Sequence, residues 1–183
     1  QNRGKKTYGK EIVQYLVEKY MYEHAMQRID YQKAEEFVSK INEICVPKKI
    51  YKLERIGKSI DSWYFAPESL EINLVISGGI GKNNDFEYHY ALKGAKVLAI
   101  DPTIPELPSK HPNITHIKKW LGANNEISKH HISIRDLIDA NPSERKLLKL
   151  DIEGSEYIAL EDCLERLQDF DLLVFEFHEM FKL

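Results

Sequence analysis

The sequence is poor in cysteine, has no long apolar run and carries no excess of basic charge. Its 183 residues include two cysteines, Cys45 and Cys163, which lie far apart and form no C-x-x-C pair. This spacing argues against a disulfide scaffold or a zinc knuckle and favours a reducing, cytoplasmic location. With 26 basic and 29 acidic residues, the chain lacks the basic surplus that binds nucleic acid. No stretch approaches the ~18 consecutive apolar residues that cross a membrane, so we expect no membrane span.

Apolar residues make up 43% of the chain, which is enough to bury one substantial core. Between residues 11 and 44, apolar positions recur at the spacing of amphipathic helices, and Pro47 ends this pattern. We therefore predict an N-terminal helical segment over residues 1–46 and a second domain over residues 47–183. The segment is expected to cover a face of that domain. The alternatives are a cap over a substrate cleft or a contact in a homodimer.

From residue 71 onward, short apolar runs alternate with segments of helical spacing. The expected strands are residues 71–76, 97–100, 114–117, 147–150 and 172–177, and the expected helices are residues 83–92, 133–138 and 155–167. Strands that alternate with helices in this way form parallel sheets with right-handed crossovers. The sequence therefore predicts an α/β fold, with a Rossmann-like open, mostly parallel sheet and helices on both faces.

A glycine-rich turn follows the first of these strands, where ligands of open parallel sheets bind. The turn reads Ser77-Gly78-Gly79-Ile80-Gly81, and glycine lets the backbone approach a ligand without a Cβ in the way. Asp101 ends the next strand, 22 residues after Gly79, near the spacing at which a carboxylate binds a ribose diol. The pair predicts a nucleoside site, whereas the turn alone is also compatible with an ordinary tight turn.

The residues around this turn argue against a phosphate cradle. A dinucleotide fingerprint requires a third glycine at the position of Asn84, and a P-loop requires glycine at Ile76 and Ser or Thr at Asn83. S-adenosylmethionine is the common adenosine cofactor that needs a glycine-rich turn and a ribose carboxylate but no phosphate cradle. An NAD(P)-dependent oxidoreductase and a non-catalytic nucleoside-cofactor-binding module stay as alternatives.

Ionisable side chains end the last two predicted strands. Asp151 and Glu153 follow the fourth strand, and Glu176 and His178 end the fifth. If the two strands are neighbours, ~4.8 Å apart, all four side chains converge on one rim. Such a group can act as a general base or bind a metal. The alternative is structural, with Glu153 or Glu176 capping a helix or pairing with Lys149.

At these residues the sequence resembles the FkbM-type methyltransferases, a branch of the class I S-adenosylmethionine-dependent family. The matching blocks are residues 55–57 with 61–64, 77–81 with 86–87, 97–103, 148–156 and 176–178. The resemblance runs from about residue 49 to residue 178. Its most specific parts are the D-x-E-G block at Asp151 and the D-P-T block at Asp101.

The resemblance implies roles for several of these residues. Gly79 and Gly81 would line the methionine end of the cofactor, and Asp101 would bind the ribose hydroxyls. Trp120 to Gly122 would flank the adenine, and Asp151 would lie close to the methionine amino group or the reacting centre. The residues thus expected to bind the cofactor are Ser77, Gly78, Gly79, Gly81, Asp101, Trp120, Leu121 and Asp151.

The expected reaction is O-methylation of a sugar or another glycan precursor. A hydroxyl is a poor nucleophile until its proton is removed, so we expect His178 or Asp151 as the base and Glu153 and Glu176 as orienting partners. A metal-assisted variant through Asp151, Glu176 and His178 stays open. Trp63 and Tyr64 lie in the aromatic stretch before the sheet. Each is expected either to fill the core or to stack on a sugar ring.

Two departures from the family pattern bear on the structure. Many class I enzymes carry an acidic residue where this chain has Ser77. Class I sheets normally have seven strands, whereas five are expected here. We therefore expect that the domain over residues 47–183 is C-terminally incomplete or completes its sheet in another way.

Overall fold

The computed structural model describes Ser39 and residues 52–58, 63–122 and 129–178. The chain divides into two compact units, one of Gln1–Val46 with Glu179–Leu183 and one of Pro47–His178. The predicted helical segment and its proposed homodimer contact lie outside the described residues, apart from the exposed Ser39. The predicted domain limits stay predictions. Within the described part of the chain, no helix has the length and apolarity that a membrane crossing requires.

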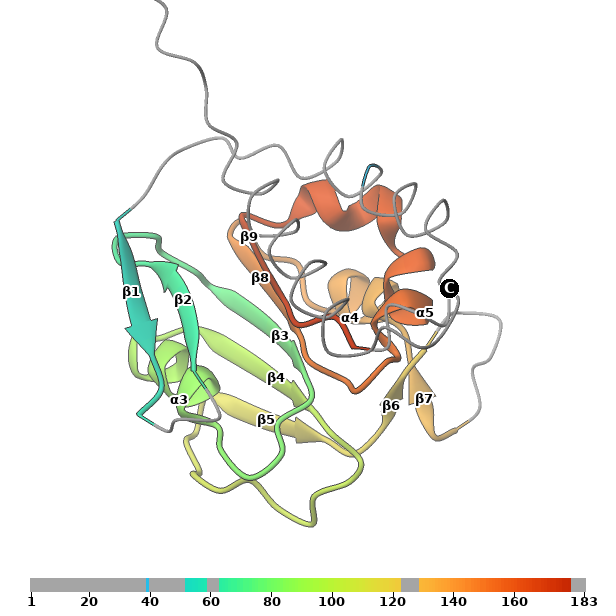
Figure 1. The fold of residues 1–183 in the computed structure, drawn as a ribbon, viewed down its shortest axis with the longest axis horizontal. Coiled ribbons are helices and arrows are strands. Elements are labelled where there is room, and N and C mark those ends of the chain that lie inside the picture. The colour runs from blue at the N-terminus through green and yellow to red at the C-terminus, as the bar shows by residue number, and fades with distance from the viewer. Residues whose placement is uncertain (1–38, 40–51, 59–62, 123–128, 179–183) are drawn as a thin grey trace, which may run out of the picture. The chain divides into compact units, whose positions relative to one another are not determined.

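A sheet of five parallel strands forms the centre of the second unit (Figure 1). The strands are β3 (Leu74–Gly78), β4 (Lys96–Ile100), β5 (Ile114–Ile117), β8 (Lys146–Leu150) and β9 (Leu172–Phe175). Their order is β5-β4-β3-β8-β9, and every neighbouring pair is parallel. The chain runs outward from β3 to β5 and then crosses back to β8, so the strand order reverses between β3 and β8. This is the predicted Rossmann-like sheet, and its reversal point is where such sheets bind ligands.

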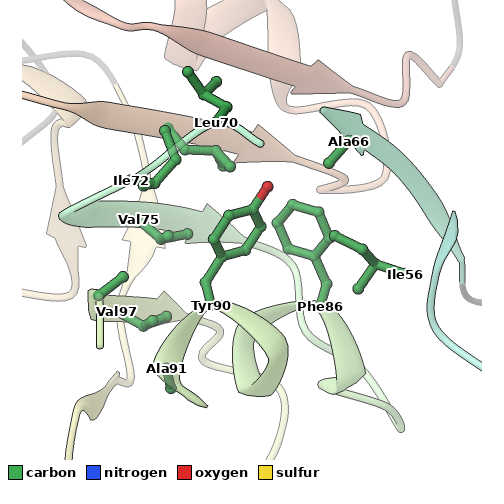
Figure 2. Packing of buried hydrophobic residues seen from close by; sticks show 11 residues of the cluster. Ile56, Ala66, Leu70, Ile72, Val75, Phe86, Tyr90, Ala91 and Val97 are labelled. Atoms are coloured by element: carbon green, nitrogen blue, oxygen red, sulfur yellow. The ribbon is translucent and has the colours of Figure 1, made fainter. Parts of the chain in front are cut away.

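One face of the sheet packs against α3 (Asp85–Leu92) and an antiparallel hairpin. The hairpin consists of β1 (Leu53–Ile56) and β2 (Tyr64–Pro67), and it occupies the aromatic stretch before the sheet. Figure 2 shows Phe86 and Tyr90 pointing from α3 toward Val75 on β3. Ile56 and Ala66 join this cluster from the hairpin, so the hairpin closes the edge of the core.

The other face carries α4 (Ile134–Ala140) and α5 (Glu156–Glu161), on the opposite side of the sheet from α3 (Figure 1). The helix expected over residues 155–167 is divided in the structure, because α5 ends at Glu161 and a separate 3-10 helix, Leu164–Asp169, follows after a turn. Arg135 on α4 donates a hydrogen bond to the Asp162 carbonyl at 2.8 Å. In a continuous α-helix this carbonyl would accept from the Arg166 amide, which here donates to the Cys163 carbonyl. A tertiary contact therefore overrides the helical spacing.

A second parallel pair, β6 (Trp120–Leu121) with β7 (His131–Ile132), was not expected from the sequence. Each strand is two residues long, too short to produce a periodic pattern. The pair places Leu121 against the end of β3. A Cβ added at Gly78 would meet the Leu121 Cδ1 atom at 2.5 Å. Glycine at this position therefore allows β6 to approach the central sheet.

Candidate active site

A cavity of about 520 Å³ lies at the carboxyl ends of the central strands. Its volume is in the range of small-molecule and cofactor sites. The predicted site residues that line it are Gly79, Gly81, Asp101, Trp120, Leu121, Asp151, Glu153, Glu176 and His178. Two predicted residues, Ser77 and Gly78, belong to β3 and are not among those lining the cavity. The strand ends therefore bring the predicted residues to one place, as the topology requires.

The glycine-rich turn passes directly against the start of the β8–α5 connection. Gly79 has φ of 76°, and a Cβ at this residue would lie 1.7 Å from the Asp151 carbonyl oxygen. The Asp151 amide donates a hydrogen bond to the Gly78 carbonyl at 3.1 Å, so two backbones touch here. Only glycine fits this contact without moving one of them.

Asp101 joins the end of β4 to the glycine-rich turn. Its Oδ2 accepts hydrogen bonds from the Ile80 and Gly81 amides, both at 2.9 Å. Its Oδ1 accepts from the Thr103 amide at 2.8 Å and from the Thr103 hydroxyl at 2.6 Å. Burial raises the pKa of Asp101, but these four hydrogen bonds outweigh it and hold the pKa below its ordinary value. The carboxylate is thus ionised, and two amides of the turn already have an acceptor.

The two side chains expected near an adenine, those of Trp120 and Leu121, lie on β6. Half of the Trp120 surface is exposed, whereas Leu121 is buried, and both line the cavity. The Trp120 amide donates a hydrogen bond to the His130 carbonyl at 2.9 Å, which fixes the backbone beside the ring. An indole held in this way offers a flat apolar surface to a planar ring.

The four ionisable residues after β8 and β9 converge. The Nε2 atom of His178 lies 3.8 Å from Asp151 Oδ1, 3.7 Å from Glu153 Oε2 and 3.8 Å from Glu176 Oε1. These distances exceed a hydrogen bond, so the three carboxylates surround Nε2 without binding it. Burial raises the pKa of Glu176, and the neighbouring Asp151 charge raises it further.

The pKa of His178 results from opposing effects. Burial lowers it, but the hydrogen bond with Glu156 and the charges of Glu156, Glu153 and Asp151 outweigh burial, so the pKa lies above the ordinary value. The imidazole therefore favours its protonated form more than a free histidine does.

Tyr64 on β2 reaches the site from 87 residues earlier in the chain. Its hydroxyl donates a hydrogen bond to Asp151 Oδ2 at 2.5 Å, and its ring packs 5.2 Å from that of Phe86. Burial and the Asp151 charge raise the pKa of Tyr64, which keeps the hydroxyl protonated as a donor. Trp63, by contrast, is 42% exposed. Of the two aromatic residues, Tyr64 fills the core and also holds a site carboxylate.

Lys149 lies buried beneath the cavity floor. Its ammonium donates a hydrogen bond to the Gly79 carbonyl at 2.5 Å and lies 3.7 Å from Asp151 Oδ2. It also lies 4.0 Å from the buried Glu87 on α3, which accepts a 2.5 Å hydrogen bond from Ser77. A carboxylate thus stands beside Ser77, where many class I enzymes carry their own acid. Among the described residues, the carboxylates within 4.0 Å of Lys149 are Asp151 and Glu87 rather than the expected Glu153 or Glu176, and Lys149 affects Glu176 only through its charge.

The contacts of Tyr64 and Lys149 with Asp151, and of Glu156 with His178, were not predicted from the sequence. Lys149 carries a detectable signal, since it is the one charged residue within the apolar run 147–150. Buried lysines require partners, and that requirement points to nearby acids. Tyr64 carries no such signal, because its contact with Asp151 depends on the tertiary structure.

Three side chains in the cavity offer atoms to a metal ion. One ligand atom from each of Asp151, Glu153 and His178 lies within 4.8 Å of the others. Carboxylate oxygens and an imidazole nitrogen suit a divalent cation such as Mg²⁺, Mn²⁺ or Zn²⁺. This set overlaps the Asp151, Glu176 and His178 set expected from the sequence and replaces Glu176 with Glu153.

Comparison with protein-family models finds a match to the methyltransferase FkbM domain over residues 37–182. Comparisons with curated proteins and with solved structures find no match. The matched range contains the whole central sheet and every residue that lines the cavity. It confirms the resemblance noted in the sequence, and the chain belongs to the FkbM methyltransferase domain family.

Proposed function

We propose that the protein is an S-adenosylmethionine-dependent methyltransferase that methylates a hydroxyl group of a sugar or glycan precursor. Membership of the FkbM methyltransferase domain family supports methyl transfer. The observation that carries the choice of cofactor is the state of the glycine-rich turn, where the Ile80 and Gly81 amides already donate to Asp101. A pyrophosphate needs such amides as free donors.

The charges in the cavity also favour this cofactor over a dinucleotide. The sulfonium and the amino group of S-adenosylmethionine are both positively charged. Four acids line the same cavity against two lysines, Lys82 and Lys119, and this acidic excess favours a cationic ligand over a pyrophosphate. The methionine part would thus lie toward Asp151, Glu153 and Glu176, with Asp151 nearest the amino group.

The nucleoside part would lie toward Trp120 and Asp101. Trp120 offers its half-exposed ring to the adenine, and the Asp101 carboxylate lines the cavity beside it. Each oxygen of Asp101 already accepts two hydrogen bonds, which fills its usual acceptor capacity. Ribose hydroxyls that bind Asp101 therefore compete with the Thr103 hydroxyl for Oδ1, and a partner for that hydroxyl must then come from the ligand.

The chain's own residues supply positioning and proton removal. When bound, the cofactor supplies an electrophilic methyl group. Tyr64 and Lys149 hold Oδ2 of Asp151, which leaves Oδ1 directed toward His178. His178 Nε2 accepts the proton of the acceptor hydroxyl, and Glu176 Oε1 lies 3.8 Å from the same nitrogen. In-line displacement depends strongly on alignment, so the fixed positions of Asp151 and His178 contribute to the rate as well as to binding.

The mouth of the cavity supports a polar acceptor. Glu153 has 86% of its side-chain surface exposed, and the Glu176 side chain is 58% exposed. Both carboxylates can accept hydrogen bonds from several hydroxyl groups at once. A sugar provides such hydroxyls at close spacing, whereas an apolar acceptor would leave both carboxylates unused.

Calorimetric titration with S-adenosylhomocysteine tests the cofactor. We expect binding by the wild-type protein and much weaker binding by Asp151→Asn, with Glu71→Gln as the control because Glu71 is an exposed acid outside the cavity. NAD binding without S-adenosylhomocysteine binding would instead indicate an oxidoreductase. Labelled methyl transfer to a panel of sugars and glycan precursors then tests the acceptor, and cofactor binding without transfer to any of them would indicate a non-catalytic module.

A further inference from the structure

Glu156, the first residue of α5, is a fully buried carboxylate that contacts the candidate base. Its Oε1 accepts a hydrogen bond from the Ile152 amide at 2.8 Å, and its Oε2 accepts one from the Gly154 amide at 3.0 Å. The Nδ1 atom of His178 lies 3.0 Å from Oε1. An ionised carboxylate only accepts hydrogen bonds, so the hydrogen of the third bond comes from His178.

The first turn of α5 therefore fixes His178 at two points. The Tyr157 hydroxyl donates a hydrogen bond to the His178 carbonyl at 2.9 Å, which anchors the backbone. Glu156 anchors the ring through Nδ1, which sets the ring's orientation as well as the nitrogen that carries hydrogen. A neutral imidazole with hydrogen on Nδ1 has its lone pair on Nε2.

That lone pair faces the cavity. The carboxylates around Nε2 come from two different strand ends, with Asp151 and Glu153 after β8 and Glu176 after β9. All three stay 3.7 to 3.8 Å away, too far to hydrogen-bond with Nε2. His178 lines the cavity, so an acceptor hydroxyl bound there can reach Nε2.

We propose that Glu156 is a positioning residue that holds His178 in the Nδ1–H form, so that Nε2 serves as the base of methyl transfer. The proposal rests on the proposed function for the identity of the reaction. In the reacting step the acceptor O–H proton moves to Nε2, and the acceptor oxygen forms the new bond to the methyl carbon. The electron pair of the broken carbon–sulfur bond stays on sulfur, and His178 becomes an imidazolium whose charge faces Glu156.

Nitrogen-15 NMR of the labelled full-length protein tests the assignment without turnover. The two tautomers give different ring-nitrogen shifts, so the neutral form of His178 in the wild type is expected to show hydrogen on Nδ1. In Glu156→Gln we expect a mixture of both tautomers. Glu161→Gln is the matched control, because Glu161 is an exposed residue at the other end of α5. A wild-type His178 with hydrogen on Nε2 would overturn the proposal, whatever becomes of the variants.

Kinetics separate positioning from a merely structural role. For Glu156→Gln we expect kcat to fall about tenfold to a hundredfold, while KM for the acceptor and the affinity for S-adenosylhomocysteine change little. An unchanged kcat together with an unchanged tautomer would also overturn the proposal. Failure of the proposed function has a different signature, since the wild-type protein would then not bind S-adenosylhomocysteine although the tautomer of His178 stays as assigned.

Discussion

The two ends of the cavity differ in how completely the protein satisfies its own polar groups. The glycine end consists of Gly79, Gly81, Asp101 and Thr103, and the acidic end consists of Asp151, Glu153, Glu176 and His178. At the glycine end, the Asp101 carboxylate accepts four hydrogen bonds from the chain. At the acidic end, three carboxylates surround His178 Nε2 beyond hydrogen-bonding distance. At the glycine end the protein therefore satisfies its own hydrogen-bonding groups, whereas at the acidic end the groups around His178 Nε2 can still bind a ligand.

The largest expected effect comes from breaking the glycine end at its tightest contact. In Gly79→Ala the new methyl group would lie 1.7 Å from the Asp151 carbonyl oxygen, so one backbone must move. We expect a loss of about 4 kcal/mol or more in the free energy of unfolding, because both strand ends shift. Chemical denaturation measures this loss.

Gly94→Ala provides the matched control for that substitution. Gly94 also has a positive φ, of 92°, but a Cβ there would have no neighbour within 4 Å. The expected loss is only the backbone cost of about 1–2 kcal/mol. Equal losses in the two variants would contradict the close approach at Gly79.

At the acidic end, His178→Asn should abolish most of the activity without changing the fold. Asparagine keeps a polar side chain but cannot accept the hydroxyl proton as a base. We expect kcat to fall about 10²- to 10⁴-fold. The affinity for S-adenosylhomocysteine, measured by calorimetry, is expected to stay near the wild-type value, and a parallel loss of affinity would place His178 in cofactor binding instead.

Tyr64→Phe tests whether the hairpin of β1 and β2 holds Asp151 in place. The change removes the hydrogen bond to Asp151 Oδ2 and keeps the ring in the core. We expect a loss of about 1–3 kcal/mol in stability, because Asp151 loses a partner in a partly buried position. Tyr88→Phe is the control, because it removes a tyrosine hydroxyl on α3 outside the cavity, where the Tyr88 ring contacts His111. We expect a smaller loss of stability for this variant in thermal unfolding.

The pH dependence of stability sharpens the comparison, because the two ends titrate in opposite senses. His178 has a pKa raised above 6.5, so its stabilising contribution is complete below pH 6.5 and is lost as the pH rises through the folded-state pKa. Asp101 has a pKa lowered below 3.8, so its contribution is complete above pH 3.8 and is lost as the pH falls through the folded-state pKa.

Unfolding free energies measured across the pH range check both limbs. His178→Asn should flatten the alkaline limb alone, and Asp101→Asn should flatten the acid limb alone. Activity should follow the same group, with kcat/KM rising as His178 loses its proton above pH 6.5. A profile that instead falls through this range would argue against His178 as the base.

The smallest expected effect is that of chelation. Lys149 lies 3.7 Å from Asp151 and offsets part of the negative charge that a cation would require. Glu153, another of the three candidate ligands, is 86% exposed and must be ordered before it can bind. We therefore expect methyl transfer to survive exhaustive treatment with EDTA. Loss of activity that Mg²⁺ or Zn²⁺ restores would assign a metal to the acidic end.

The central sheet could be predicted from the sequence because its inner strands β3, β4 and β8 are almost entirely buried. Strands such as β3 and β4 then appear as short apolar runs, and their alternation with helices predicts that they pair in parallel. The length of α5 could not be predicted, since it depends on Arg135 binding the Asp162 carbonyl. The pair β6–β7 was missed because its strands are too short for any period.

The candidate site was predictable to the extent that strand ends determine it. Asp151 and His178 follow strands that lie side by side, so their meeting follows from topology alone. The residues that hold them, Tyr64 and Glu156, were given no such role because each acts through one side-chain hydrogen bond. Spacing along the chain does not show which nitrogen of a histidine carries hydrogen, or which oxygen of a carboxylate is already bound.

The contact between Gly79 and Asp151 also has a thermodynamic consequence. The backbones of the two turns touch, and Lys149 bonds to the first while lying beside the second, so neither turn can move alone. A ligand that orders one turn therefore also restricts the other turn. A second ligand that contacts that other turn then loses less conformational entropy when it binds. We therefore expect the proposed acceptor and the proposed cofactor to raise each other's affinity by the same factor.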